Sequence, residues 1–506
     1  MARRCLIKGG QGRKPFEIKD FSGGLVTKSP PKNIETRFSV DCFNVYSEGA
    51  ILRRRDGISV VNPTAVSGDG NGLYNWIRGS ATTNQWLMGV WGSALYKMDI
   101  TAGVWDGTWD AITADAASGT AFSNSIVHFA NFNGVLLIST DSWDTIQKIT
   151  TSNASFFNMI TGGSGTAPKA KFVFNWKNHA WFANVLNSED QVVHSSVNSY
   201  NNFTGSLFGA NTLLTENDIG ITGGFILNGR LYITKAFSIH RFTYTGSPSP
   251  LVDIRTIKSV VGTRAHRTIK NVNTPEGEVV LFLGSNKKLY LCDGQDTQDI
   301  SDAIDVTNGL SSVYMQAINE KIFSKCFAIV HEDLNWYELF FGIGTGTDDK
   351  PTHSIVYDYR IKSFWPMTNR NFTYGSISDN GSGKRVAYVQ GTAGKAYALG
   401  STNSDDGTAI GYRWTSEKIG QPILLQRIDE IEVETDIVAC RPSFAWRGDW
   451  ESDWVTQTMS SGTNSHNWAS NRIDNMIQFR ISGSDTSAPL KLWTILGSER
   501  AIGGGK

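Results

Sequence analysis

The sequence lacks an excess of charge of either sign. Its 506 residues include 47 Lys plus Arg and 47 Asp plus Glu. A chain without net charge has no long-range attraction to nucleic acid or to an anionic membrane surface. The balance therefore argues against a tight nucleic-acid binder, although it is compatible with a neutral surface along which DNA slides.

Cysteine is also scarce. The five cysteines are scattered along the chain, at Cys5, Cys42, Cys292, Cys326 and Cys440. Their number is odd and no Cys-x-x-Cys pair occurs, so neither a disulfide framework nor a zinc site is expected. We predict small buried thiols in a reducing cytosol instead.

Long apolar runs are absent as well. No run reaches the length needed to cross a bilayer, and the basic N-terminus lacks the apolar core of a secretory signal. We therefore expect a chain that is soluble where it is made. Residues 1–19 predict a mobile arm with solvated charges rather than a nucleic-acid-binding arm. Its basic residues, interrupted by glycines, are Arg3, Arg4, Lys8, Arg13, Lys14 and Lys19.

The motifs of nucleotide-binding enzymes and hydrolases are missing too. Residues 342–346 lack the last glycine of the dinucleotide-binding pattern, and Gly383-Lys384 is followed by Arg385 instead of the Ser or Thr that binds magnesium. No Gly-x-Ser-x-Gly elbow and no His-Glu-x-x-His helix occurs. The paired carboxylates of a glycosidase are close in space rather than in sequence, so spacing does not exclude them.

Three polar turns match parts of known sites without completing them. Residues 293–299 and 403–407 are rich in acidic and amide side chains but lack the terminal Glu of a calcium loop, which predicts solvated turns. Residues 106–109, Asp-Gly-Thr-Trp, match part of the Asp-box of propeller glycosidases once only, and we predict a turn capped by the packing of Trp109. We therefore predict no catalytic, cofactor-binding or metal-binding residues and no enzyme activity.

Glycine and aromatic side chains are abundant. The chain contains 51 Gly but only 13 Pro, and 11% of its residues are aromatic, which suits frequent hairpin turns and large apolar sheet faces. In residues 221–304, short β-branched and aromatic runs alternate with Gly, Asn, Asp and Ser, a pattern typical of strands and turns. Asn228-Gly229 lies between two such runs and predicts a tight hairpin.

A loose repeat extends this pattern along the chain. A turn pair, one variable residue and two mostly apolar residues recur at intervals of about 40 to 60 residues, close to the period of a four-stranded propeller blade. Six copies lie at 92–96, 133–137, 178–182, 228–232, 286–290 and 394–397, and a degenerate seventh lies at 335–341. We predict a β-propeller of seven blades, with six or eight as alternatives and an array of β-sandwiches as the competing fold.

Two segments depart from the repeat. Residues 311–325 place apolar side chains mostly at three- and four-residue intervals, which predicts one short amphipathic helix between two blades. After residue 400 the strands become longer and most of them alternate, as in 428–434, 476–481 and 490–495, which predicts sheets with one wet face. The aromatic and charged loop 444–454 is either a contact surface or local core packing.

The fold class that follows is all-β, with a propeller and an additional β-sandwich or platform domain built from both ends of the chain. Residues 1–60 are predicted to supply an N-terminal arm and strands that join the platform. Residues 61–400 are predicted to form the propeller, and residues 401–506 the C-terminal part of the platform.

Short motifs along nearly the whole chain resemble the tail hub, or nozzle, proteins of short-tailed bacteriophages, the family that includes tail tubular protein B. The motifs are Phe21-Ser22-Gly23-Gly24-Leu25, Asp41-Cys42-Phe43-Asn44-Val45, Gly49-Ala50-Ile51-Leu52-Arg53-Arg54-Arg55-Asp56-Gly57, Lys235-Ala236-Phe237-Ser238-Ile239-His240-Arg241-Phe242, Val261-Gly262-Thr263-Arg264-Ala265, and Ile355-Val356-Tyr357-Asp358-Tyr359 before Trp365.

The resemblance implies a structural protein of the virion tail, assembled in the host cytoplasm. It implies a homo-hexameric ring below the portal–adaptor complex, in contact with the head-to-tail adaptor and with other tail proteins such as fibres or spikes. Double-stranded DNA would pass through the ring without membrane insertion of the protein. A charge-balanced chain suits a conduit, because each neutralised phosphate adds affinity that would retard DNA. The alternatives are a propeller that binds or cleaves cell-surface glycans and a soluble scaffold for protein partners.

Overall fold

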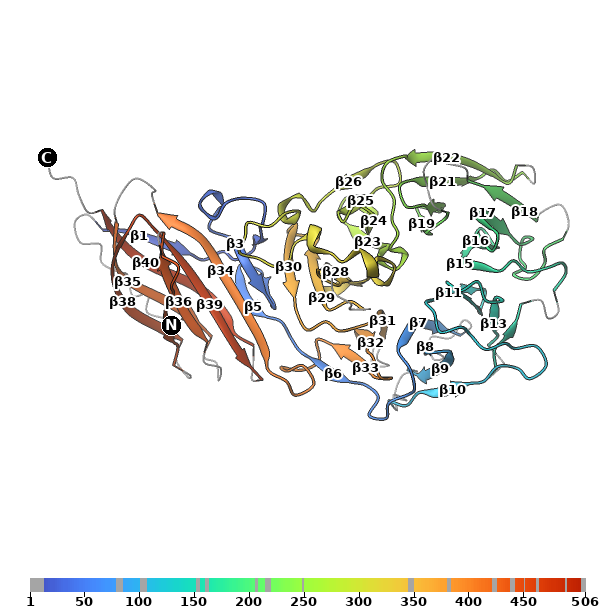
Figure 1. Cartoon of the computed structure of the whole chain (residues 1–506), viewed down its shortest axis with the longest axis horizontal. Helices are drawn as coiled ribbons and strands as arrows, with labels where there is room; N and C mark the ends of the chain where they lie inside the picture. Colours follow the sequence, from blue (N-terminus) through green and yellow to red (C-terminus); the bar gives the residue numbers. More distant parts are fainter. Residues whose placement is uncertain are drawn as a thin grey trace.

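The computed structural model describes residues 13–78, 85–100, 107–151, 155–159, 163–204, 208–213, 220–247, 250–344, 350–379, 384–420, 426–436, 442–449, 451–460, 464–486 and 489–501. Several sequence predictions lie outside these residues. They concern residues 1–12 of the basic arm, Asp106 of the Asp-box fragment, residues 345–346, Gly383, Cys440 and Trp450. The described chain is almost entirely β-strand and falls into a ring of small sheets and a block of longer strands (Figure 1).

The ring contains seven four-stranded antiparallel sheets within the described residues. Blade 1 consists of β7 (Gly70–Ile77), β8 (Gln85–Trp91), β9 (Ala94–Asp99) and β10 (Asp110–Ile112). Blade 2 consists of β11 (Val127–Phe132), β12 (Val135–Thr140), β13 (Gln147–Ile149) and β14 (Phe157–Asn158). Blade 3 consists of β15 (Ala170–Trp176), β16 (His179–Val185), β17 (Ser188–His194) and β18 (Gly209–Thr212).

The next three blades repeat the same order along the chain. Blade 4 consists of β19 (Gly223–Leu227), β20 (Arg230–Thr234), β21 (Ile239–Tyr244) and β22 (Val252–Lys258). Blade 5 consists of β23 (Lys270–Thr274), β24 (Gly277–Leu283), β25 (Leu289–Cys292) and β26 (Thr297–Asp299). Blade 6 consists of β27 (Phe327–His331), β28 (Trp336–Phe341), β29 (His353–Asp358) and β30 (Ser363–Met367).

Blade 7 closes the ring with a strand from the other end of the chain. It consists of β31 (Tyr374–Asp379), β32 (Arg385–Gln390), β33 (Ala396–Leu399) and β6 (Ile58–Val60). β6 pairs with β33, and β31 of this blade contacts β7 of blade 1, so the fold is a closed seven-bladed β-propeller. The predicted boundary at residue 60 is therefore too late, because β33 takes its outer partner from residues 58–60.

The predicted repeat marks one hairpin in each blade. Four copies, at 133, 178, 228 and 335, lie between the first and second strands. Three copies, at 92, 286 and 394, lie between the second and third strands. Positive φ angles at the turns, such as 49° at Asn228 and 70° at Gly229, account for the Asn and Gly of the pattern. The spacing between copies is irregular because some copies mark the first hairpin of a blade and others mark the second.

The block of longer strands is a sandwich of two six-stranded sheets in the described residues. In one sheet the order is β38 (Ser465–Asp474), β35 (Gln426–Thr435), β40 (Lys491–Ala501), β5 (Ile51–Arg54) and β4 (Val45–Glu48), with β1 (Arg13–Ile18) also paired to β40. In the other it is β2 (Gly24–Leu25), β3 (Phe38–Phe43), β34 (Ile410–Gly420), β39 (Met476–Asp485), β36 (Ser443–Gly448) and β37 (Val455–Thr458). Strands from both ends of the chain thus share each sheet.

Aromatic rings join the two sheets of this platform. Phe16 of β1 stacks on Phe479 of β39 at 5.6 Å between ring centroids, and Phe444 of β36 stacks on Trp468 of β38 at 5.2 Å. The same hydrophobic core continues into blades 5 and 6 of the propeller. Two of the Trp and Phe residues of the predicted loop 444–454, Phe444 and Trp446, are therefore core residues of a strand.

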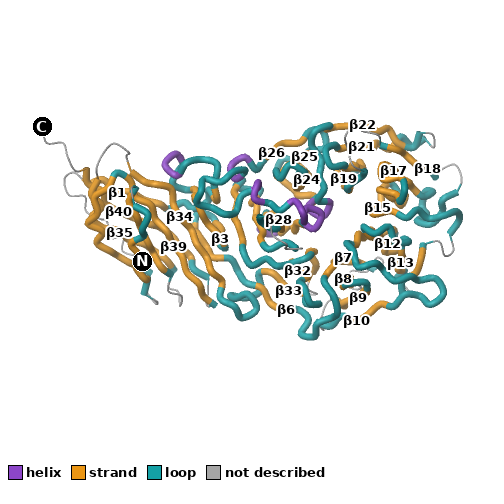
Figure 2. Tube along the Cα trace, in the orientation of Figure 1, coloured by secondary structure: helices purple, strands orange, loops and turns teal. Residues whose placement is uncertain are grey.

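The predicted amphipathic helix at 311–325 is wrong. The segment lies between blades 5 and 6 as expected, but it forms two 3-10 turns, η4 (Met315–Ala317) and η5 (Glu320–Lys325), with Ile322 outside helical geometry. Its backbone bonds instead to the end of β28, where Asn319 N donates to Gly342 O at 2.9 Å. Figure 2 shows these turns as short separate coils. The other 3-10 turns are η1 (Pro31–Asn33), η2 (His266–Thr268), η3 (Asp302–Ile304) and η6 (Glu332–Leu334).

Candidate functional site

The motif at 21–25 attaches the platform to blade 6 of the propeller. Gly24 has a φ of 75°, and a Cβ at this position would lie 2.8 Å from the backbone N and O of Phe364 in β30. Phe21 is buried, and its ring packs against Trp414 in a T-shaped, edge-to-face arrangement with 5.1 Å between the ring centroids. A tight bend anchored by buried apolar side chains therefore brings the N-terminal segment into direct contact with the propeller.

Asn44, in the second motif, bonds to both parts of the molecule. Its Oδ1 accepts hydrogen bonds from Thr368 N and Arg55 Nε, both at 2.8 Å, and its Nδ2 donates to Gly411 O at 2.7 Å. Its backbone N donates to Pro366 O of β30. Asn44 has a φ of 56°, a conformation that asparagine tolerates better than most residues. One side chain thus links β3, β34 and the end of blade 6.

Arg55, in the third motif, forms a buried ion pair with Asp405. Its Nη1 and Nη2 donate to the two carboxylate oxygens at 2.7 and 2.6 Å, and the side chains are only 3% and 10% exposed. The neighbouring Arg54 donates to Asp485 O and Asn403 O. The prediction of a solvated turn at 403–407 is therefore wrong for Asp405, because this turn lies over the arginines that leave β5.

The last motif lies in the same region of the molecule. Val356 of β29 pairs in register with Trp365 of β30, and Trp365 is fully buried. Elsewhere, the two motifs from the middle of the chain contact each other, since Thr263 N donates to Lys235 O at 3.0 Å. Four of the six motifs that carry the family resemblance thus meet at the junction between platform and propeller.

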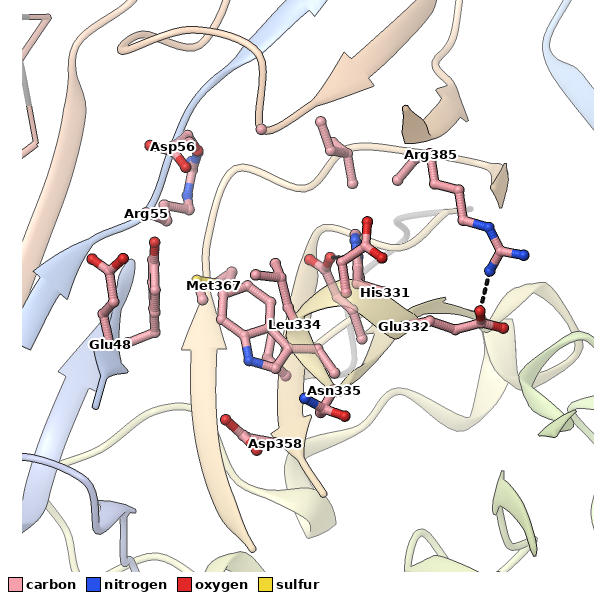
Figure 3. Close-up of a pocket in the computed structure, with 18 of the residues that line it drawn as sticks. Glu48, Arg55, Asp56, His331, Glu332, Leu334, Asn335, Asp358, Met367 and Arg385 are labelled. Carbon is pink, nitrogen blue, oxygen red and sulfur yellow. Dashed lines mark hydrogen bonds and ion pairs between the residues drawn. The ribbon is translucent and has the colours of Figure 1, made fainter. Parts of the chain in front are cut away.

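A groove runs along this junction (Figure 3). Its volume is about 540 Å³. Glu48, Arg55 and Asp56 line it from the platform side, and Leu334 lines it from blade 6. Blade 7 contributes residues including Arg385, which forms an ion pair with Glu332 across the groove. The rim of the groove carries charges of both signs.

Glu338 lines the groove and is held in its charged form. Its carboxylate pairs with His331 at 3.0 Å and Arg370 at 3.4 Å and accepts a hydrogen bond from Ser354 Oγ at 2.6 Å. Burial alone would raise the pKa of Glu338, but Arg370 together with His331 and Ser354 lowers it to about 2. Such a carboxylate stabilises blade 6 and the segment that follows it, whereas a general acid near neutral pH needs a raised pKa.

Side chains cross the propeller axis. His128 of β11, Phe172 of β15 and His266 of η2 form a triangle of rings with centroid separations of 4.8 to 5.1 Å. These residues come from blade 2, blade 3 and the segment entering blade 5, so the contacts span the centre of the ring. Arg267 likewise lies over the Tyr374 ring of blade 7 at 4.7 Å. The axis of one propeller therefore has no space for a DNA duplex.

The far side of the platform presents an open strand edge. Within the described residues β37 pairs only with β36, and all four of its residues are exposed. Trp454 just before it packs against Arg447 and Arg480, whose guanidinium carbons lie 4.6 and 4.0 Å from its ring centroid. The opposite end of the same sheet is β2, which contacts β30 of the propeller.

The remaining polar turns and cysteines have structural partners. Asp293 Oδ1 accepts hydrogen bonds from Gln295 N and Asp296 N, which closes its own turn, and Trp109 is buried against Trp91 at 6.0 Å. Cys42, Cys292 and Cys326 are buried free thiols, and burial raises the pKa of Cys292 to about 11 and of Cys326 to about 12. No group of three potential metal ligands occurs in the described part of the chain.

Comparison with known proteins gives little beyond the fold. No known protein family and no curated protein matches the chain. Among solved structures the chain is similar to YCF48 from Cyanidioschyzon merolae, with 9% sequence identity and a TM-score of 0.38. This match covers 68% of the present chain and 98% of YCF48. No helix among the described residues is long and apolar enough to span a membrane.

Proposed function

We propose that the protein is a structural component of a phage tail. In this proposal, copies form a homo-oligomeric, hexameric nozzle or hub ring below the portal–adaptor complex, and genomic double-stranded DNA is retained and ejected through it. The observation that carries the proposal is the convergence of family-like motifs at one junction. Motifs at 21–25, 41–45, 49–57 and 355–365 are far apart in the sequence yet join platform to propeller.

The junction suits a subunit that must resist mechanical stress. A shared hydrophobic core, the buried Arg55–Asp405 pair and the Asn44 hydrogen bonds fix the platform relative to blades 6 and 7. Breaking any one of these contacts would expose apolar groups or leave buried polar groups without partners. The platform and the propeller therefore resist bending against each other. A ring that surrounds pressurised DNA needs subunits with this kind of fixed internal angle.

The closed propeller axis bears on where DNA would pass. Because rings of His128, Phe172 and His266 meet at the centre of one propeller, a duplex passes only through a channel that several copies surround. The balance of 47 basic and 47 acidic residues favours such a channel, since a strongly basic wall would bind the phosphates. Both features support an assembly whose channel belongs to the ring and not to the subunit.

The open edge at β37 is the surface we assign to contact between copies. Natural edge strands usually avoid pairing by means of Lys, Pro or bulges. Residues 455–458 read Val-Thr-Gln-Thr, carry no charge and are exposed, so among the described residues their outer backbone edge is open to another strand. The neighbouring edge strand β38 lies on the same side of the sandwich, since only a short connection separates it from β37. Strand addition by the next copy would continue the sheet around the ring.

Lysines on this edge test the assignment. The double substitution Thr456→Lys/Gln457→Lys places two charges on β37, and we expect at least tenfold less ring at equal concentration, measured by analytical ultracentrifugation. The monomer should keep its thermal unfolding temperature, because both side chains are exposed. Asn33→Lys, an exposed position on η1, serves as the matched control. Equal assembly of the two variants would remove β37 from the ring contact.

The glycan-binding or glycan-cleaving alternative draws on the junction groove. Its rim carries the carboxylates of Glu48, Asp56 and Asp333, which could bind sugar hydroxyls. Release of reducing sugar from host polysaccharide, abolished by Asp333→Asn, would favour this alternative over the nozzle. If purified protein releases no sugar and binds no polysaccharide, this alternative fails.

A further inference from the structure

A second hollow lies at one end of the propeller axis. Its volume is about 230 Å³, and it is lined by segments that lead into the inner strands of five blades. These are the start of β7 with the residue before it, the segment before β11, η2 before β23, the end of η5 before β27, and the residue before β31, and the segment before β29 also contributes to the lining. Among the described residues, more basic than acidic side chains line the hollow, and none of these basic residues takes part in the contacts between platform and propeller.

Arg267 is the buried cation of this hollow. The residue is only 5% exposed, and its Nη2 donates to the backbone carbonyls of Lys325 at 2.9 Å and Thr373 at 3.2 Å. Its Nε has no hydrogen-bond partner among the described residues, and no carboxylate there forms an ion pair with it. Asp141, whose charge acts on Arg267, already bonds His128 at 2.9 Å. A buried guanidinium without an ion-pair partner is costly unless another charged group compensates it.

Two further cations line the same hollow. Lys325 and Lys350 contribute to its wall, and neither ammonium group forms an ion pair with a described residue. The acidic side chain in the lining is Asp69, whose Oδ1 accepts a long hydrogen bond from Ala393 N at 3.4 Å. Three cationic side chains against one carboxylate leave an excess of two positive charges. The lining of the hollow therefore favours an anion as its occupant.

We propose that this axial hollow binds a small, multiply charged oxyanion of the phosphate or pyrophosphate class. The site is smaller than the roughly 300–1,000 Å³ pockets that hold drug-sized ligands, so a compact anion fits it better than a nucleotide. Guanidinium and ammonium donors match phosphate oxygens in charge and geometry. Bound there, the anion would tie five of the seven blades together at one end of the axis.

The anion site lies entirely within one propeller, so it does not depend on the assembly of several copies into a ring. The same phosphate chemistry has two sources, a free inorganic anion or the terminal phosphate of a nucleic acid strand. A duplex is too wide for the hollow, so a strand would enter only by its phosphorylated end. The two sources are separated by comparing free pyrophosphate with short single-stranded oligonucleotides that carry or lack a 5′-phosphate.

Calorimetric titration of the full-length chain tests the site with three probes: inorganic phosphate, pyrophosphate and the pair of oligonucleotides. We expect at least one phosphate-bearing probe to bind, and the double variant Lys325→Gln/Lys350→Gln to weaken binding at least tenfold. The control is Lys32→Gln/Lys169→Gln, which removes two exposed lysines elsewhere.

The variants are compared without anion as well. Both double variants should unfold at the temperature of the unmodified chain, because the altered lysines make no ion pairs. Addition of pyrophosphate should then raise the unfolding temperature of the control but not that of the Lys325/Lys350 variant. Binding of pyrophosphate identifies a free anion as the ligand, and binding of only the 5′-phosphorylated strand identifies a nucleic acid end. Absence of binding by every probe, or equal binding by the two double variants, would overturn the proposal.

Discussion

At the scale of single residues, the Arg55–Asp405 pair is the strongest test of the junction. Asp405→Asn leaves a buried guanidinium without its counter-charge, and we expect unfolding to become easier by about 3 kcal/mol. Urea unfolding at neutral pH measures the change. Asp406→Asn is the matched control, because this exposed neighbour has a φ of 48° that asparagine also tolerates. A loss below 1 kcal/mol for Asp405→Asn would show that the pair does not stabilise the junction.

Glu417 gives a second prediction at this scale. This residue of β34 is buried, and neither carboxylate oxygen has a hydrogen-bond partner among the described residues. Burial raises the pKa of Glu417 from 4.5 to about 7. Below pH 4.5 both the folded and the unfolded chain hold the proton, and between pH 4.5 and 7 only the folded chain does. This group therefore lowers stability as pH rises, by about 3 kcal/mol in total.

The substitution Glu417→Gln removes this titration. Urea unfolding at several pH values should show the variant to be more stable than the unmodified chain above pH 7 and similar to it near pH 4. Comparing the difference between the two chains cancels the contributions of other titrating groups. A difference that does not change with pH would contradict the burial of an ionisable Glu417.

Sequence reasoning found the motifs of the junction but not their contacts. Arg55 and Asp405 are both visible as polar residues beside turns, and nothing local distinguishes a solvated turn from one that covers an arginine. The same holds for Glu338, whose partners His331 and Arg370 belong to different strands and loops. Which side chains meet across hundreds of residues is decided when the propeller closes on the platform. The local sequence pattern does not encode that closure.

At the scale of elements, Gly→Ala substitutions in two hairpins distinguish the energetic cost of a strained turn from the cost of a steric clash. Gly229 and Gly394 both have positive φ, 70° and 74°. A Cβ at Gly229 would meet nothing within 4 Å, whereas at Gly394 it would collide with Val66 O on the segment between β6 and β7. We expect Gly229→Ala to cost about 1 kcal/mol and Gly394→Ala about 3 kcal/mol or more.

Chemical unfolding of the two glycine variants measures these costs. The difference between them reports the contact through which the N-terminal segment closes blade 7. Equal costs would mean that the closure adds nothing beyond the strain of the left-handed turn.

Elements with a local signal were predicted well, and those fixed by tertiary contacts were not. The hairpin repeat predicted the propeller and seven blades, because each turn needs Asn or Gly wherever the blade lies. The apolar spacing at 311–325 predicted a helix that the structure replaces with 3-10 turns, since Asn319 and Gly344 bond to neighbouring segments instead. Residues 58–60 are too short a strand to be assigned to the propeller from sequence.

At the scale of the whole molecule, the chain combines a platform with an exposed edge strand, β37, and a propeller whose axis is filled by side chains. The propeller and the platform share a core, the junction contains most of the family-like motifs, and β37 faces away from the propeller. If copies pair through this edge, the channel lies between them and its lining is set by the ring. In the proposed nozzle, the charge balance of the chain would keep DNA mobile within this channel.

The most direct measurement is electron microscopy of the full-length chain mixed with a portal–adaptor complex, together with native mass measurement of the product. The account predicts a closed ring of six copies attached below the adaptor, with propellers around an open central channel. Chains that remain monomeric in the presence of the adaptor, or a channel that runs through a single propeller, would contradict it.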